Sequence, residues 1–171
     1  MQHVVLVGLM GAGKTTVGRR CAALLDRPFV DTDDLVVVLT GMPFPEFFAR
    51  HGEAPFRELE RQAVADVCAS PEPLVIACGG GTVLDPDNRR RLRERGVVVW
   101  LRAPVAVLAT RVGDGADRPL LAGDPESALR RLDALRAGAY ESAAHAEVET
   151  GGLDVEAAAE AVLAAYRAQA A

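Results

Sequence analysis

Lys14 is the only lysine of this 171-residue chain, and it stands in a glycine-rich segment. The chain has 19 basic residues, and the other 18 are arginines. Residues 8–15 read G-L-M-G-A-G-K-T and fit the pattern G-x-x-x-x-G-K-[ST]. In that pattern backbone N–H groups surround phosphates, the ammonium reaches the β- and γ-phosphates, and the hydroxyl binds Mg²⁺. A guanidinium does not replace a compact ammonium there. The segment therefore predicts a nucleoside triphosphate site, and the alternative is a chance glycine-rich turn.

Asp31 and Asp33 indicate which phosphate chemistry follows. The guanine-reading motif Asn-Lys-x-Asp cannot exist here, because Lys14 is the sole lysine. The third predicted strand ends in Cys-Gly-Gly-Gly, without the acid that motor ATPases place there. The two acids follow the second strand instead, where one can hold metal-bound water and the other an acceptor hydroxyl. This favours a kinase for a small hydroxylated acceptor over a hydrolase. The alternative role for Asp33 is a helix N-cap.

Phosphoryl transfer to an alcohol also requires cations and a lid that excludes water. Arg57 and Arg136 are candidate forks for a carboxylate, and the alternative is that both are solvated helix residues. Arg118 lies in a long loop that can close onto the phosphates. The glycines at 79–81 follow a buried strand and allow the backbone to approach a ligand closely, unless they form a plain flexible turn.

Alternating strands and helices must position these residues. Continuous apolar runs predict buried strands at 3–7, 28–31, 74–77 and 97–101, with a weaker strand at 146–149. Helical periodicity predicts helices at 15–25, 33–39, 44–50, 53–69, 86–95, from 104 onward, 126–143 and 154–168. This alternation predicts an α/β fold with a parallel sheet that helices cover on both sides.

Local signals predict where several elements begin and end. Gly96 is expected to close the helix at 86–95 from the C′ position, where a left-handed conformation suits glycine. Pro104 is expected to start the next helix, and Asp154 to cap the last one. Residues 113–123 are rich in Gly, Asp and Pro and are expected to form a long mobile loop.

The composition fits one globular domain, with half of the residues hydrophobic, a quarter charged and no internal repeat or linker. The net charge of −5 disfavours binding to nucleic acid or to a membrane surface, because both require a basic footprint. The arginine-rich segment 89–95 is interpreted as the solvated face of a helix. No apolar run approaches membrane-spanning length, and no secretory signal is expected.

Cys21, Cys68 and Cys78 are widely spaced and form no C-x-x-C motif. Three separated cysteines fit buried thiols in a reducing compartment better than a disulfide framework or a zinc site. Cys78 directly precedes the three glycines and is interpreted as a small buried residue rather than a redox group. A soluble cytoplasmic protein is therefore expected.

Six motifs together resemble those of the shikimate kinases. The phosphate loop is followed by Asp-x-Asp, Phe-Arg-x-x-Glu, Gly-Gly-Gly, Arg-Pro-Leu-Leu and an arginine a few residues before a tyrosine. In this chain they are residues 8–15, 31–33, 56–60, 79–81, 118–121 and Arg136 with Tyr140. Each motif alone is common, but all six occur in the family's order and span most of the chain.

The resemblance implies a three-layer, nucleoside-kinase-like P-loop fold, with a five-stranded parallel sheet in the order 2-3-1-4-5. It implies one domain, with a mobile lid at about 112–124 in the family's pattern. The implied activity is ATP-dependent phosphorylation of the 3-hydroxyl of shikimate, on the route to chorismate and the aromatic amino acids, with Mg²⁺ as cofactor. The expected protein is a cytoplasmic monomer that uses shikimate and ATP and binds neither nucleic acid nor membrane.

The resemblance also implies roles for single residues. Asp33 is the base, and Lys14 and Arg118 act with it in catalysis. Thr15 and Asp31 support Mg²⁺. The implied shikimate-binding residues, of which the two arginines grip the carboxylate, are Asp33, Arg57, Gly79, Gly80, Gly81 and Arg136. The implied nucleotide-binding residues are Gly11, Ala12, Gly13, Lys14, Thr15, Thr16, Arg111 and Arg118.

Two segments depart from the family pattern. Residues 150–152 read Thr-Gly-Gly, where many family members carry a basic or amide side chain near the adenine. Any adenine contact there is expected to involve the backbone only. Residues 113–117 are unusually acidic for a lid beside a phosphate site.

Two other functions stay open. Another small-molecule P-loop kinase, such as a gluconate kinase, would also use paired arginines, although Asp-x-Asp together with Gly-Gly-Gly favours shikimate. A catalytically silent module that binds nucleotide and signals to a partner is the second alternative. The presence of Lys14, Asp33 and Arg57 disfavours it.

Overall fold

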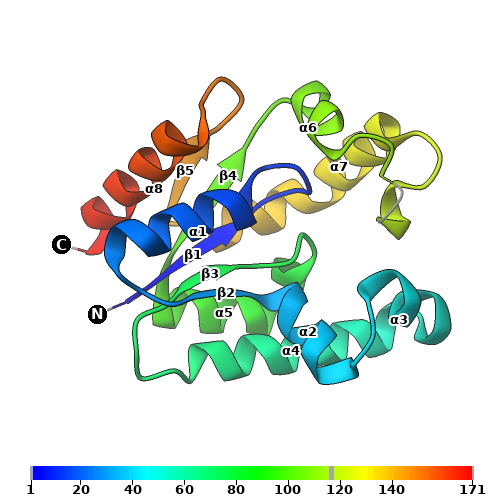
Figure 1. Ribbon diagram of the computed structural model, residues 1–171, viewed down its shortest axis with the longest axis horizontal. Coiled ribbons are helices and arrows are strands. Elements are labelled where there is room, and N and C mark those ends of the chain that lie inside the picture. The colour runs from blue at the N-terminus through cyan, green and yellow to red at the C-terminus, as the bar shows by residue number, and fades with distance from the viewer. Residues whose placement is uncertain (1, 116–117, 171) are drawn as a thin grey trace.

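The computed structural model describes residues 2–115 and 118–170. Five strands form one sheet in the order β2-β3-β1-β4-β5, and every neighbouring pair is parallel, as the resemblance implies (Figure 1). The strands are β1 (His3–Val7), β2 (Phe29–Asp31), β3 (Val75–Ala77), β4 (Gly96–Arg102) and β5 (Ala146–Glu149).

Helices cover both faces of this sheet, which confirms the predicted layers. Helices α1 and α8 pack against each other on one face, and α4, α5 and α7 lie on the other (Figure 1). None of the helices in the described part of the chain is long and apolar enough to cross a membrane. The helices are α1 (Lys14–Leu25), α2 (Thr32–Thr40), α3 (Phe44–His51), α4 (Glu53–Cys68), α5 (Pro86–Arg95), α6 (Val105–Val112), α7 (Pro125–Ala143) and α8 (Val155–Ala170).

The central strand β1 forms the middle of the main core. All five of its residues are buried, because β3 and β4 flank it and helices cover both of its faces. Its continuous apolar run is what a strand in that position requires. Acidic side chains cap the start of α5 and of α8: Asp85 Oδ1 accepts from Asp87 N at 2.8 Å, and Asp154 Oδ1 accepts from Ala157 N at 2.8 Å.

One predicted helix end is wrong in its conformation. Gly96 has φ −153° and ψ 170°, so it is extended and begins β4 directly after α5. Glycine is required there for space rather than for a left-handed turn. A Cβ at this position would lie 2.8 Å from Val5 Cγ2 and 2.9 Å from His3 O. The close approach of β4 to β1 therefore explains the residue.

The arginine-rich segment of α5 does more than face solvent. Arg93 Nη1 donates to Ala143 O at 2.9 Å and to Ala144 O at 3.0 Å, at the end of α7. Arg95 Nε donates to Cys68 O at 2.8 Å, at the end of α4. The last carbonyls of a helix lack intrahelical partners and attract cations. The segment thus ties two helix ends to α5, which the prediction of a solvated face did not anticipate.

The predicted loop at 113–123 contains a short 3-10 helix, Pro119–Leu121. Leu121 is fully buried in the main core, and the segment packs against α7. The chain is therefore anchored at this end of the expected lid. Ala116 and Asp117, which belong to the acidic segment predicted there, lie outside the described residues.

Two helical glycines offer a matched test of this packing. A Cβ at Gly18 in α1 would lie 2.6 Å from Phe29 Cε2 and 3.3 Å from Leu6 Cδ1, whereas a Cβ at Gly138 in α7 meets nothing within 4 Å. We expect Gly138→Ala to raise the free energy of unfolding by up to about 1 kcal/mol, because alanine favours the helix. We expect Gly18→Ala to lower it by about 1–3 kcal/mol through overpacking.

Urea unfolding of both variants and of the parent chain measures the difference. Equal stabilisation by the two substitutions would show that the interface between α1 and β2 accommodates the added methyl group without strain. That result would contradict the expected overpacking at Gly18.

Candidate active site

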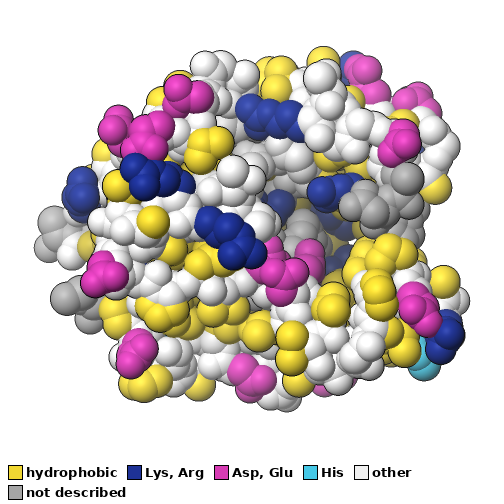
Figure 2. All heavy atoms as spheres, in the orientation of Figure 1, with side chains coloured by type: hydrophobic (Ala, Val, Ile, Leu, Met, Phe, Trp, Pro, Cys, Tyr) yellow, Lys and Arg dark blue, Asp and Glu magenta, His cyan; other side chains and the backbone are white. Residues whose placement is uncertain are grey.

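A cleft of about 830 Å³ lies at the carboxyl ends of the central strands. Figure 2 shows the hollow, with basic and acidic side chains around it. Its walls come from the phosphate loop, from helices α2 to α4, and from α6, α7 and the segment between them. The predicted site residues that line it are Gly11, Ala12, Gly13, Lys14, Thr15, Thr16, Asp31, Asp33, Arg57, Gly80, Gly81, Arg111, Arg118 and Arg136.

Gly79, the remaining predicted residue, lies behind the lining. Its N–H donates to Thr32 Oγ1 at 3.0 Å. A Cβ on it would lie 2.5 Å from Asp33 Oδ1 and 2.8 Å from Glu60 Oε1. Gly79 therefore makes room for two carboxylates, and its contact with an acceptor stays a prediction.

The phosphate loop forms an open cradle before α1. Gly13 is the N-cap of this helix, and no side chain of the described residues caps it. The first N–H groups of the helix thus face the cleft, where an anion can accept from them. Gly11 has φ +81°, and a Cβ on it would lie 3.0 Å from Leu108 O, so glycine keeps the loop close against α6.

Lys14 is held by the loop that carries it. Its Nζ donates to Gly8 O at 2.8 Å and to Leu9 O at 2.9 Å. Removal of the ammonium from water lowers the pKa of Lys14 to about 8, although the Asp33 and Asp31 carboxylates oppose the shift. An anionic ligand beside Nζ would therefore favour the charged form strongly.

Asp31 connects the phosphate loop to α2. Its Oδ2 accepts from Thr15 Oγ1 at 2.7 Å, and its Oδ1 accepts from Asp33 N at 3.0 Å. Asp31 is therefore the N-cap of α2, the role considered above for Asp33. No three His, Cys, Asp or Glu side chains of the described residues cluster as a metal site. A hydroxyl next to a carboxylate nevertheless suits Mg²⁺, which uses one or two protein oxygens beside phosphates and waters.

Asp33 stands in the first turn of α2, with its carboxylate in the cleft. Burial, together with the negative charges of Asp31 and Glu60, raises its pKa to about 6, against the influence of Lys14 and Arg57. A carboxylate with such a pKa is mostly ionised at neutral pH and accepts a proton more readily than an exposed aspartate.

Glu60 is a site residue to which the sequence analysis assigned no role. It is 1% exposed and accepts from Thr82 Oγ1 at 2.6 Å and from Arg57 Nη1 at 2.8 Å. Arg57 also donates to Glu53 Oε1 at 3.2 Å and lies against Gly81, where a Cβ would overlap its guanidinium. Glu60 thus fixes the orientation of Arg57. The only local signal was its place in the Phe-Arg-x-x-Glu motif, three residues after Arg57.

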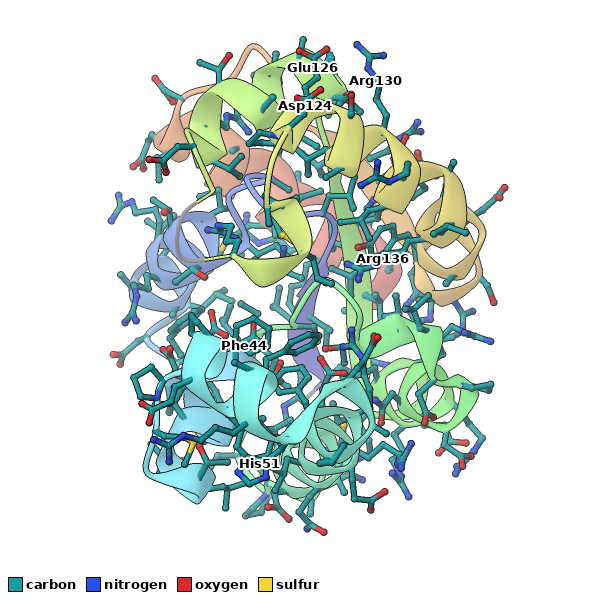
Figure 3. The ribbon with its side chains drawn as sticks, turned by 90° about the vertical axis from the view of Figure 1, so that its right-hand side faces the viewer. Phe44, His51, Asp124, Glu126, Arg130 and Arg136 are labelled. Carbon is teal, nitrogen blue, oxygen red and sulfur yellow. The ribbon has the colours of Figure 1, made fainter. Side chains whose placement is uncertain are left out.

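Arg136 points inward from α7 (Figure 3) and is only 3% exposed. A Cβ at Gly80 would lie 3.0 Å from its Nη1. Within the described residues, this buried nitrogen has no hydrogen-bond partner. Tyr140, one turn later, donates its hydroxyl to Gly80 O at 2.5 Å, and burial raises its pKa to about 12. An unpaired buried guanidinium nitrogen is costly, so the site is suited to an anion that pairs with it.

Arg111 and Arg118 line the same cleft from α6 and from the segment after it. Arg111 Nη2 donates to Thr150 O at 2.8 Å, and its Nη1 donates to Gly11 O at 3.1 Å. Arg111 thus spans the phosphate loop and the loop after β5. Cys78 also borders the cleft, but burial raises the pKa of its thiol well above the usual range, which fits the predicted structural role.

Comparisons with known proteins identify the family to which this chain is similar. The family model for shikimate kinase matches residues 10–167. A shikimate kinase of Burkholderia pseudomallei is 47% identical over 150 residues, which cover 87% of this chain and 81% of the relative. A shikimate kinase of Pelotomaculum thermopropionicum is 42% identical over 164 residues, which cover 95% of this chain and 94% of the relative.

Solved structures agree with the sequence comparison. A shikimate kinase from Acinetobacter baumannii in complex with shikimate superposes with a TM-score of 0.94 at 37% identity, covering 99% of this chain and 94% of that one. A gluconokinase from Sinorhizobium meliloti reaches a TM-score of 0.61 at 20% identity, covering 98% of this chain and 93% of that one, a likeness of fold alone. The chain therefore belongs to the shikimate kinase family.

Proposed function

We propose that this chain transfers the γ-phosphoryl group of ATP to the 3-hydroxyl of shikimate, which gives shikimate 3-phosphate and ADP. The observation that carries the proposal is the buried Nη1 of Arg136, which has no partner in the described part of the chain and lies in the cleft that also holds Asp33 and the phosphate loop. A small acceptor with one carboxylate and several hydroxyls satisfies this arrangement, because its carboxylate pairs with the guanidinium while a hydroxyl meets Asp33.

In this proposal two arginines position the acceptor. Arg136 supplies a donor that no described residue pairs with, and Arg57 is held in place by Glu60 and Glu53. The backbone of Gly80 and Gly81 lets the acceptor ring lie close to the sheet. Fixed donors of this kind hold the reacting oxygen in line with the γ-phosphate, and such positioning supplies most of the catalysis in phosphoryl transfer.

Asp33 takes the hydroxyl proton in the proposed reaction. Its pKa of about 6 leaves the carboxylate ionised at neutral pH while making it a better proton acceptor than an exposed aspartate. The proton passes from the acceptor hydroxyl to a carboxylate oxygen of Asp33 as the oxygen–phosphorus bond forms.

The nucleotide is proposed to bind along the phosphate loop. The N–H groups at the start of α1 donate to its phosphates, and Lys14 exchanges its carbonyl partners for phosphate oxygens. Thr15 and Asp31 would hold Mg²⁺, which supplies charge neutralisation for the β- and γ-phosphates. Arg118 reaches the phosphates from the segment between α6 and α7, the proposed lid.

We propose the same setting for this enzyme as the sequence predicts, a single-domain monomer in the cytoplasm. The three cysteines are free and buried, which supports a reducing compartment. The lid is proposed to comprise residues 112–124.

An acceptor panel tests the proposed function. In an assay that couples ADP release to NADH oxidation, we expect turnover with shikimate and MgATP at least about 100-fold above that with gluconate or a nucleoside monophosphate. We also expect nucleotide and shikimate to enhance each other's binding in titrations. Turnover with gluconate and none with shikimate would refute shikimate as the acceptor. Nucleotide binding without any turnover would support a catalytically silent module.

The fall of kcat/KM at low pH should follow the protonation of the Asp33 carboxylate. Because its pKa is raised to about 6 and the ionised form is active, we expect kcat/KM for shikimate to fall about tenfold per pH unit below pH 6. Asp33→Asn should lower kcat by about 10²–10⁴-fold at neutral pH and remove this acid limb. Asp66→Asn, on the exposed face of α4, is the control and should keep the wild-type profile. An acid limb near pH 4 would contradict the assignment of the base.

Lys14→Arg should keep the positive charge but lose most of the phosphoryl-transfer rate. The guanidinium does not fit where Nζ donates to Gly8 O and Leu9 O, so we expect kcat to fall by about 100-fold or more, the scale of one lost transition-state donor. The reverse exchange, Arg20→Lys on the exposed side of α1, should change kcat less than about twofold. Near-normal turnover of Lys14→Arg would show that charge alone suffices.

A further inference from the structure

Thr150 stands where three elements of the nucleotide wall meet. It follows β5 directly, it faces the phosphate loop, and it contacts Arg111 in the last turn of α6. The residue is only 2% exposed, so its hydroxyl must find its partners within the protein. Neither composition nor motif spacing assigned this side chain a function.

The Thr150 hydroxyl lies within hydrogen-bond distance of more than one polar group. Thr150 Oγ1 lies 3.0 Å from Arg102 O, at the end of β4, and 3.3 Å from Ala12 O in the phosphate loop. It also accepts from Arg111 Nη1 at 3.3 Å. A hydroxyl donates one hydrogen and accepts through two lone pairs. Its single hydrogen is therefore shared between two carbonyls, while a lone pair meets the guanidinium.

Backbone contacts hold Thr150 itself in place. Its N–H donates to Arg102 O at 2.7 Å, and its carbonyl accepts from Arg111 Nη2 at 2.8 Å. The next residue, Gly151, donates to Glu149 Oε1 at 2.9 Å, and a Cβ on it would lie 2.9 Å from Pro104 Cδ. The loop after β5 is thus packed tightly before any nucleotide arrives.

Arg111 gains its orientation from these same groups. Its planar fork donates to Gly11 O through Nη1 at 3.1 Å and to Thr150 through both Nη1 and Nη2. An exposed arginine otherwise samples many rotamers, and ordering it on binding costs free energy. The contacts with Thr150 order it in advance, at a place that borders the cleft.

We propose that Thr150 is a positioning residue for the nucleotide: its hydroxyl locks Arg111 and the Ala12 carbonyl of the phosphate loop into the arrangement that ATP meets. The inference rests on the proposed function for the identity of the nucleotide. The side-chain hydroxyl bonds of Thr150 go to α6, to the phosphate loop and to the end of β4, whereas the acceptor residues Asp33 and Arg136 stand on α2 and α7. The effect of Thr150 is therefore confined to the nucleotide side.

A pair of substitutions at this position tests the role. Thr150→Val keeps the shape and removes the hydroxyl, whereas Thr150→Ser keeps the hydroxyl. We expect Thr150→Val to raise KM for ATP and the Kd of a non-hydrolysable ATP analogue about tenfold, the scale of one lost hydrogen bond to a charged group. KM for shikimate should stay within about twofold, and Thr150→Ser should restore wild-type values to within about threefold.

Arg111→Met removes the guanidinium, which is the exposed partner of Thr150, and leaves the buried residues unchanged. If the two residues act together, the double variant with Thr150→Val should bind the analogue no more than about threefold more weakly than the weaker single variant. Multiplicative losses in the double variant would overturn the coupling. Equal losses in Thr150→Val and Thr150→Ser, or a Thr150→Val variant that only lowers Tm, would overturn the role of the hydroxyl.

The analogue titration does not depend on the acceptor. A chain that fails to phosphorylate shikimate but shows the expected loss of affinity in Thr150→Val would refute the proposed function and leave the role of Thr150 intact. If the chain phosphorylates shikimate while the parent, Thr150→Val and Thr150→Ser all bind the analogue equally well, the proposed function stands and the role of Thr150 is refuted.

Discussion

The register of three parallel strands determines where the phosphate loop, the two acids and the three glycines of this protein lie. Leu6 of β1 pairs with Ala77 of β3, and Ala77 pairs with Asp31 of β2. Because parallel strands release their following loops at one edge, the phosphate loop, the two acids and the three glycines meet there. A slip of one residue would turn each strand's side chains to the opposite face. The observed register of these buried strands therefore also builds the site.

Burial adjusts the charges that this edge collects. It moves both Lys14 and Asp33 toward their neutral forms, and it leaves Arg136 Nη1 unpaired among the residues that the structure describes. Glu60 remains compensated, because Arg57 and Thr82 both donate to it. In the free protein, Lys14 and Arg136 are therefore cations that are largely removed from water in one cleft. An anionic ligand would stabilise their charged forms. The desolvation that shifts the pKa values of Lys14 and Asp33 thus also favours tight binding of an anion.

Sequence patterns predicted most of the fold, because buried strands and amphipathic helices leave local signatures. They also predicted the residues whose types carry chemistry, such as Lys14 and Asp33. They missed features that depend on distant partners: Gly96 is set by β1, Arg93 by the end of α7, and Thr150 by the phosphate loop. Such contacts join residues far apart in the chain, and neither spacing nor propensity records them. The assignment of roles at the site remains a prediction.

The single lysine has a consequence for how this protein can be handled. Amine-directed reagents react with the uncharged form, and a pKa of about 8 leaves about a tenth of Lys14 uncharged at pH 7. No other side chain of the sequence offers an amine. Dyes, cross-linkers or resins coupled through lysine would therefore occupy the phosphate loop rather than a harmless surface. Labelling that is measured at Lys14 itself, apart from the α-amino group of the chain, would therefore report directly whether the nucleotide site is filled.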